Sequence, residues 1–281
     1  MTDRNEIIFT RKSFALMGIV NITPDSFYDG GCYNSIDAAV EYALKLVEQG
    51  ADIIDIGGAS SRPGAVQITA AEELHRILPV VEKVGKYFKG PISIDTTWSE
   101  VAEAAIDAGA SWINDISAGR FDSRMASVVA QRGCTVVLMH SRGTPQTMQQ
   151  HTSYKNLTME VREELLGAVS EFTAAGVKKE KIIIDPGIGF AKTAQQNVEL
   201  LQGISEFTNT GYTVLIGTSR KSFIGRITGR EVEQRLWGTL GTVASAYYRG
   251  ARIFRVHDVR ETADFLKVFS VIENNLPIDH F

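Results

Sequence analysis

The sequence has very little cysteine: only Cys32 and Cys134 occur in 281 residues, far apart and without a CxxC motif. A small secreted domain held together by disulfides is therefore excluded, and a reducing compartment is favoured. An apolar stretch near the N-terminus is also lacking, because MTDRNEIIFTRKSF carries charge throughout. No signal peptide is expected, and we predict a cytoplasmic protein.

Long hydrophobic runs and a large excess of one charge are missing too. A membrane helix needs roughly eighteen or more consecutive apolar residues, and the chain contains no such stretch. The formal net charge is −4, with both signs spread along the chain, so no basic stripe suggests a nucleic-acid partner. The apolar fraction of 44% and the charged fraction of 22% are those of an ordinary globular protein. We expect neither a membrane nor a nucleic acid as partner.

Short apolar runs alternate with segments of helical periodicity along the chain. The runs that we predict to be strands are 15–21, 53–57, 92–95, 112–116, 135–140, 182–185, 213–217 and 253–256. The predicted helices are 36–48, 70–88, 100–108, 123–132, 158–174, 195–207, 231–248 and 261–273. Eight strands alternating with eight helices predict a closed parallel (β/α)8 barrel.

The whole chain, 1–281, is predicted to be a single domain, with residues 1–14 as an N-terminal extension. No proline-rich or glycine-serine linker divides it, and barrels of this length are common. The alternative is an open doubly wound sheet, but the phosphate-binding GxGxxG signature is missing after the first strand. The barrel is therefore favoured.

Polar side chains or glycine turns stand at the ends of the predicted strands. The side chains at these ends include Asn21, Asp95, Asn114, His140 and Asp185. One such residue is usually a helix cap, but in a barrel all eight strand ends meet at one rim, where active sites lie. A polar pocket explains the whole set better than capping does.

The residue types at this rim suggest a ligand. Two carboxylates and an amide, Asp95, Asp185 and Asn114, suit a flat heterocycle rich in N–H groups, because a carboxylate accepts paired hydrogen bonds and an amide both donates and accepts. Arg255 and His257 are two positions apart and face the same side if the strand continues. With the glycine turn after the seventh strand, they form a candidate anion site.

Asn21 and two long loops complete this prediction. The Asn21 amide oxygen suits Mg²⁺, which binds few protein ligands together with phosphate oxygens. The loops TPDSFYDGGCYNS and GASSRPGAVQIT are polar, contain glycine and are longer than a barrel connection requires. Loops of this kind commonly act as lids over a reaction.

Eight segments between Met17 and Val259 carry a resemblance to a known family. They are MGIVNITPDSF, GADIIDIGGASSRPGA, SIDT, INDISAG, VVLMHSRGTPQTM, IIIDPGIGFAKT, GTSRKSFIG and RVHDV. In this order they resemble the dihydropteroate synthase family, the pterin-binding barrel enzymes of folate biosynthesis. The resemblance implies a transferase that joins 6-hydroxymethyl-7,8-dihydropterin pyrophosphate to p-aminobenzoate and releases pyrophosphate. It further implies Mg²⁺ as cofactor, a homodimer, and sulfonamides as inhibitors.

The resemblance also implies residue roles by position. The implied pterin site is Asp95, Asn114, Met139, Asp185, Phe190, Gly217 and Lys221. The implied pyrophosphate site is Asn21, Arg255 and His257, with Asn21 also as the metal ligand. The implied p-aminobenzoate site is Phe27, Ser61, Arg62, Pro63, Lys221 and Ser222. The implied catalytic groups are Asp95, Lys221, Arg255 and His257.

Three positions depart from the family pattern. Ser61 stands where threonine is usual, Tyr28 where serine is usual, and Ser141 where methionine is usual. These changes leave the polar pocket groups intact and concern lid packing and sulfonamide affinity.

Several alternatives remain open at this point. Lys221 could form a Schiff base, as in barrel aldolases, although neighbouring Arg220 and Ser222 favour anion contact. The same barrel also presents methyl-tetrahydrofolate in corrinoid methyltransferases, and a non-catalytic pterin-binding protein is conceivable. SRKSF and RVHDV argue against both. His140 is either a cap or a packing residue, and a catalytic zinc is not expected, because His140 and His257 lack a third ligand at recognisable spacing.

Overall fold

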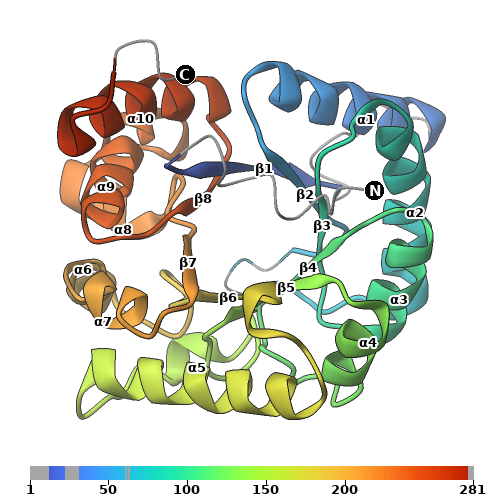
Figure 1. Cartoon of the computed structure of the whole chain (residues 1–281), viewed down its shortest axis with the longest axis horizontal. Helices are drawn as coiled ribbons and strands as arrows, with labels where there is room; N and C mark the ends of the chain where they lie inside the picture. Colours follow the sequence, from blue (N-terminus) through green and yellow to red (C-terminus); the bar gives the residue numbers. More distant parts are fainter. Residues whose placement is uncertain (1–12, 23–31, 61, 63, 278–281) are drawn as a thin grey trace.

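Parallel strands close into a barrel that is surrounded by helices (Figure 1). The computed structural model describes residues 13–22, 32–60, 62 and 64–277. The strands pair in chain order: β1 (Ala15–Asn21), β2 (Ile53–Gly57), β3 (Ile92–Asp95), β4 (Trp112–Asp115), β5 (Thr135–Met139), β6 (Ile182–Asp185), β7 (Thr213–Ile216) and β8 (Ile253–Val256). The predicted (β/α)8 barrel is confirmed.

Helices connect the strands on the outside of the barrel (Figure 1). They are α1 (Cys32–Glu48), α2 (Ala70–Tyr87), α3 (Ser99–Asp107), α4 (Met125–Arg132), α5 (Leu157–Ala174), α6 (Ala194–Gln202), α7 (Ile204–Thr208), α8 (Ser222–Thr228), α9 (Leu236–Tyr248) and α10 (Val259–Asn274). Over the described ranges, none of them is long and apolar enough to cross a membrane.

The predicted helix 195–207 is wrong as a single element, because it is two helices, α6 and α7. Gly203 separates them, and its N–H donates to the carbonyls of Glu199 and Leu200 and so ends α6. Helix α8 was not predicted, because it is only seven residues long and follows a loop. The predicted strands 112–116, 135–140 and 213–217 each end one residue earlier in the structure.

The core lies in two places, inside the barrel and between the barrel and the helices. The interior cluster consists of Ala15, Met17, Ile53, Trp112, Val137, Ile183, Leu215 and Ile253. Side chains of alternate strand residues point to opposite faces, so the other strand residues pack against the helices in a second, larger cluster. The interior is therefore filled with side chains and is not an open pore.

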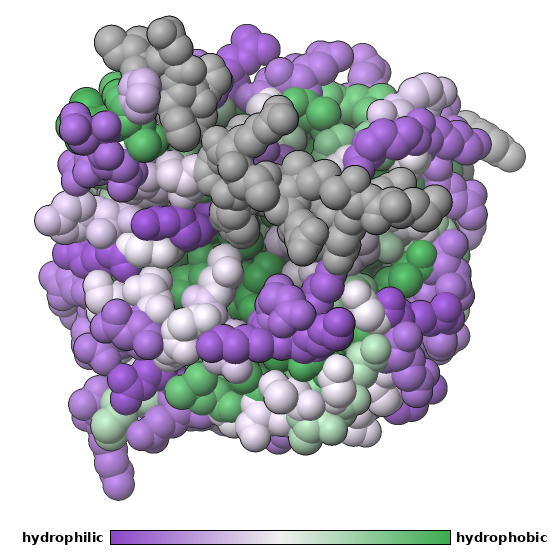
Figure 2. All heavy atoms as spheres, in the orientation of Figure 1, coloured by the Kyte–Doolittle hydropathy of each residue, from purple (hydrophilic) through white to green (hydrophobic). Residues whose placement is uncertain are grey.

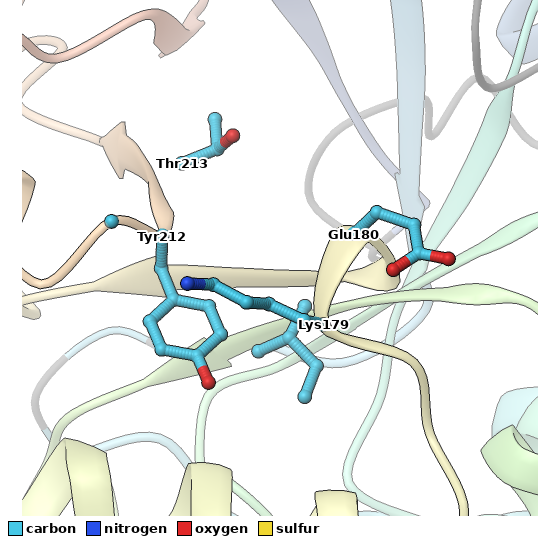
Figure 3. Close-up of a pocket in the computed structure, with 6 residues that line it drawn as sticks. Lys179, Glu180, Tyr212 and Thr213 are labelled. Carbon is cyan, nitrogen blue, oxygen red and sulfur yellow. The ribbon is translucent and has the colours of Figure 1, made fainter.

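Strand alternation places a polar layer directly above this apolar one. Two positions after the interior residues stand the polar side chains of Asp55, Asn114, Asp185 and Arg255, together with Met139 and with Gly217, which directly follows β7. Parallel pairing brings Asp95 opposite Asn114 and Met139 opposite Asp185. Polar side chains at the carboxyl ends of the strands thus lie above the apolar layer of the barrel interior. On the outer surface, hydrophilic residues dominate the perimeter of the molecule (Figure 2).

Candidate active site

An arginine on β8 joins two carboxylates at the rim. Arg255 Nε lies 2.6 Å from Asp55 Oδ2, and Arg255 Nη2 lies 2.8 Å from Asp95 Oδ2. The amide nitrogen of Asn114 donates to the same Asp55 oxygen at 3.3 Å. Asp55 is completely buried, and within the described ranges its Oδ1 has no hydrogen-bond partner. Four strands therefore contribute to one charged cluster.

Burial sets the electrostatics of this cluster. It raises the pKa of Asp95 to about 7, an effect that Arg255 opposes and the charge of Asp55 strengthens. Burial also acts to lower the pKa of Arg255, but Asp55 and Asp95 outweigh it, so that the pKa lies above its usual value. One fixed cation is thus shared between two carboxylates. A ligand that brings further N–H donors would stabilise the ionised form of Asp95.

The second acceptor of the rim is Asp185, at the end of β6. It is 5% exposed, and its Oδ1 accepts the N–H of Gly187 at 2.7 Å. Burial raises its pKa, while Lys221 and the Gly187 bond act in the opposite direction. A ligand with several N–H groups would stabilise the ionised form of this carboxyl too.

Lys221 and Phe190 stand next to each other beside Asp185. The Lys221 ammonium lies 4.6 Å from the centre of the Phe190 ring and donates to the carbonyl of Ile188. Burial lowers the pKa of Lys221 to about 8, against the opposing charge of Asp185. Gly189 has φ of +88°, a backbone conformation that favours glycine, and a Cβ there would lie 2.9 Å from Lys221 Cδ. The two side chains form one wall of the site.

His257 and Asn21 lie at the same rim, as predicted. His257 Nδ1 is 2.9 Å from Ser219 Oγ, and burial, with the positive charges of Arg255 and Arg220, lowers the pKa of His257 to about 4. The ring is therefore neutral at pH 7 and offers an N–H rather than a charge. A Cβ at Gly57 would meet Asp95 Cβ at 3.3 Å and Asn21 Oδ1 at 3.8 Å, so Asn21 and Asp95 flank Gly57 at the rim.

Part of the predicted p-aminobenzoate site falls outside the described residues: Phe27, Ser61 and Pro63. Arg62 is exposed, and Ser222 is the exposed first residue of α8. The loop after β2 contacts the loop after β5, where the Gly64 N–H donates to the Pro145 carbonyl at 2.9 Å. Within the described ranges, no cluster of three His, Cys, Asp or Glu side chains could bind a metal ion.

The sequence prediction missed Asp55, which completes the charged cluster. The signal was its position inside the apolar strand IIDIG, two residues after the barrel-facing Ile53. A buried charge within a strand needs a partner, and a search for one among the strand-end cations would have found Arg255.

Comparisons with known proteins agree with this geometry. Residues 17–257 match the family described as pterin binding enzyme. The dihydropteroate synthase of Synechocystis sp. is 48% identical over 258 residues, which are 92% of this chain and 89% of that protein. The chain belongs to the dihydropteroate synthase family of pterin binding enzymes. Its activity is the transfer that forms the C–N bond of dihydropteroate in folate biosynthesis.

Solved dihydropteroate synthase structures have the same fold. That of Xanthomonas albilineans with 4-aminobenzoic acid has a TM-score of 0.89 and 42% identity, and the match covers 95% of both chains. That of Yersinia pestis with a sulfonamide drug complex has a TM-score of 0.88 and 37% identity, covering 93% of this chain and 95% of the other. Among the interpretations left open above, membership of the dihydropteroate synthase family favours the transferase over an aldolase or a corrinoid methyltransferase.

Proposed function

We propose that this rim holds the pterin of 6-hydroxymethyl-7,8-dihydropterin pyrophosphate against Asp95, Asn114 and Asp185 while p-aminobenzoate displaces pyrophosphate. The observation that carries the proposal is a pair of carboxyls with raised pKa values above an apolar layer: Asp185, which is buried, and Asp95, whose side chain is 12% exposed. Such groups suit a flat ligand whose edges carry N–H donors.

The proposed pterin contacts follow from the donors and acceptors at the rim. Asp185 accepts from the ring N3–H and the 2-amino group, and Asp95 and Asn114 bind the opposite edge. Lys221 donates to the pterin carbonyl. Met139, Phe190 and Gly217 line the slot, and the absence of a side chain at Gly217 leaves room beside Arg255, whose Cβ would be 3.8 Å from a Cβ there.

The proposed reaction is a substitution at the methylene carbon between pterin and pyrophosphate. The carbon–oxygen bond to pyrophosphate breaks, the amine nitrogen of p-aminobenzoate forms the new bond, and that nitrogen loses a proton. The electron-rich dihydropterin delocalises positive charge, so pyrophosphate leaves early. The aromatic amine is neutral at pH 7, so no strong base is required. The protein supplies positioning, and Arg255 and His257 stabilise the leaving group.

Mg²⁺ is the cofactor that we propose for this step. Asn21 offers an amide oxygen at the rim, and Mg²⁺ typically takes one or two protein oxygens and fills its remaining positions with water and phosphate. The lack of a three-residue metal cluster in the described part of the chain fits such a site better than an all-protein cage. The ion would neutralise charge on the pyrophosphate.

The p-aminobenzoate site is proposed at the outer side of Lys221, with Ser222, Arg62 and the loop residues Phe27, Ser61 and Pro63. The related structures with 4-aminobenzoic acid and with a sulfonamide support p-aminobenzoate as a substrate and sulfonamides as inhibitors. Lys221 and Ser222 would meet the carboxylate of the substrate.

We also propose that the protein is a homodimer of the cytoplasm. Large apolar side chains are exposed on the outer faces of neighbouring helices: Trp237 (79%) and Tyr248 (70%) on α9, and Val268 (63%) and Ile272 (69%) on α10. Trp237 and Tyr248 are three helical turns apart and share one face, as do Val268 and Ile272. Exposed apolar faces of this kind commonly cover each other in dimers. Sedimentation of the purified protein tests this proposal, and a monomer at all concentrations would contradict it.

Turnover by the purified protein tests the proposed function. With both substrates and Mg²⁺ it should form 7,8-dihydropteroate and pyrophosphate in equal amounts, and omission of p-aminobenzoate should abolish the product. A protein that binds pterin without turnover would be a binding protein only. Calorimetry with pyrophosphate and Mg²⁺ adds a second arm, because a methyltransferase half needs no pyrophosphate site.

A further inference from the structure

We propose that Lys192 is a positioning residue for the pterin: its buried amine, held by His140, fixes the loop between β6 and α6 so that Asp185 and Phe190 grip the ring. This inference rests on the proposed function. Lys192 follows the strand end by seven positions and is predicted to touch neither substrate.

Lys192 is buried to an unusual degree for a lysine, at 3% exposure. Its Nζ lies 3.0 Å from His140 Nδ1 and 2.9 Å from the carbonyl oxygen of Phe190. Burial lowers its pKa far below the usual lysine value, and the carboxylate of Asp185 acts in the opposite direction. An amine donates to both acceptors whether it carries two hydrogens or three, so these contacts persist through its titration.

His140 extends the contact to the outer helix α5. Because the amine donates to Nδ1, the hydrogen of the neutral ring resides on Nε2, which lies 3.0 Å from Glu164 Oε2. Burial, with the positive charge of Lys192, lowers the pKa of His140 to about 4, so the ring stays neutral at pH 7. Arg142 holds Glu164 in turn. A surface ion pair thus anchors a buried lysine, and His140 is neither a cap nor mere packing.

The loop that Lys192 holds is packed without spare room. A Cβ at Gly187 would lie 1.9 Å from the His140 carbonyl oxygen, and the His140 N–H donates to the Asp185 carbonyl at 2.9 Å. Further along, the Gly189 N–H donates to Asn197 Oδ1 at 2.6 Å. These contacts therefore hold the end of β6, the turn at Gly187 and the segment that carries Phe190 together as one unit.

The loop carries two of the proposed pterin contacts, Asp185 and Phe190. Asp185 begins it, Phe190 lies two residues before Lys192, and the Phe190 ring contacts the Lys221 ammonium. Release of the Phe190 carbonyl from the Lys192 amine would free the ring and, through the turn, the carboxyl. Arg255 lies on β8, His257 directly follows that strand and Asn21 ends β1, so all three are outside this loop. Loss of the Lys192 amine should therefore lower the affinity for the pterin and leave the affinity for pyrophosphate unchanged.

The variant Lys192→Met distinguishes a positioning role from a role in which the side chain only fills space. Methionine has nearly the same length and suits a buried position better than lysine does. If Lys192 only fills space, Lys192→Met keeps full substrate affinity. If its hydrogen bonds position the loop, Lys192→Met raises the KM for the pterin substrate at least tenfold and changes the KM for p-aminobenzoate less than twofold. Lys192→Arg, which retains donors, recovers part of the loss.

The experiment combines these kinetics with calorimetry of 6-hydroxymethylpterin and of pyrophosphate with Mg²⁺, using Lys178→Met at an exposed position as control. We expect pterin affinity to fall at least tenfold in Lys192→Met, with pyrophosphate affinity unchanged. Unchanged pterin affinity, or an equal loss for both ligands, would overturn the positioning role.

Two further measurements separate the role of Lys192 from the proposed function and from a failure of the variant to fold. Wild-type protein that makes no dihydropteroate would refute the proposed function, whereas the binding comparison decides on Lys192 alone. If Lys192→Met does not fold, His140→Gln takes its place, because it removes the ring acceptor and leaves the lysine. A threefold or larger loss of pterin affinity in His140→Gln supports the role, and no loss overturns it.

Discussion

Two layers of the same barrel differ in polarity although they lie two residues apart on shared strands. Ile183 and Leu215 face the axis in the lower layer and are buried among other apolar side chains. Asp185 on β6 and Arg255 on β8 face the same axis in the upper layer and carry charge. The alternation of a parallel strand therefore lets one element hold both a core and a ligand site.

The two layers also contribute to stability in opposite ways. Removal of apolar surface from water stabilises the lower layer. In the upper layer, Asp55 Oδ1 is buried without a partner in the described part of the chain, and burial raises the pKa of Asp95 and Asp185. These are desolvation costs that a donor-rich ligand would relieve. The rim should therefore be stabilised by substrate and the lower layer should not.

The largest effect is expected from Arg255→Met. It leaves the buried carboxylate of Asp55 and the partly buried one of Asp95 without their shared cation, which should lower the free energy of unfolding by about 3–5 kcal/mol at pH 7. Pyrophosphate affinity should fall, and so should pterin affinity, because Asp95 loses the group that orients it. Chemical denaturation and calorimetry measure both. Adding Asp55→Asn should restore part of the stability, and no restoration would show that the charges are not the cause.

The lower layer should respond in stability alone. Leu215→Ala creates a cavity in the closed barrel and should lower the free energy of unfolding by roughly 3–4 kcal/mol. Pterin affinity of the folded variant should stay within twofold of wild type, since Gly217 and its neighbours stay in place. A large loss of affinity with little loss of stability would contradict the division into two layers.

A smaller effect, dependent on pH, is expected from Glu73→Gln at the start of α2. Burial raises the pKa of Glu73 from 4.5 to about 7, and within the described ranges its Oε1 has no partner. The folded state holds this proton more tightly than the unfolded state does. Its contribution to stability is therefore complete below pH 4.5 and is lost as the pH rises through about 7.

Glutamine at position 73 cannot lose a proton, so the variant should gain stability over wild type as the pH rises. The difference should be near zero at pH 4 and reach about 3 kcal/mol at pH 8. Thermal unfolding at several pH values measures it. A constant difference between pH 4 and pH 8 would show that Glu73 titrates alike in both states.

The sequence predicts what local pattern determines. Alternation of apolar runs and helical segments is enough for the barrel, and the rule that strand ends meet is enough to gather Asp95, Asn114 and Asp185 at one rim. The break at Gly203 was not predicted because the apolar pattern runs through α6 and α7 without interruption. The short helix α8 was not predicted because seven residues are too few to show a helical hydrophobic period.

Contacts between distant residues could not be read from the sequence. Arg255 was predicted as an anion ligand, but its bonds to Asp55 span 200 positions and depend on closure of the barrel. His140 stayed ambiguous because its partner Lys192 is 52 positions away. Local sequence places a side chain on a face, whereas the register of the closed sheet decides which side chains meet there.

Asp185→Asn tests whether the upper layer binds a pterin through its carboxyls. The amide turns a donor toward pterin donors, so affinity for 6-hydroxymethylpterin should fall at least tenfold, about 1.4 kcal/mol or more, while thermal stability is retained or rises. Asp107→Asn on the outer surface, where the side chain is 58% exposed, is the matched control and should bind as wild type. Calorimetric titration of both variants gives the answer. Wild-type pterin affinity in Asp185→Asn would contradict the account.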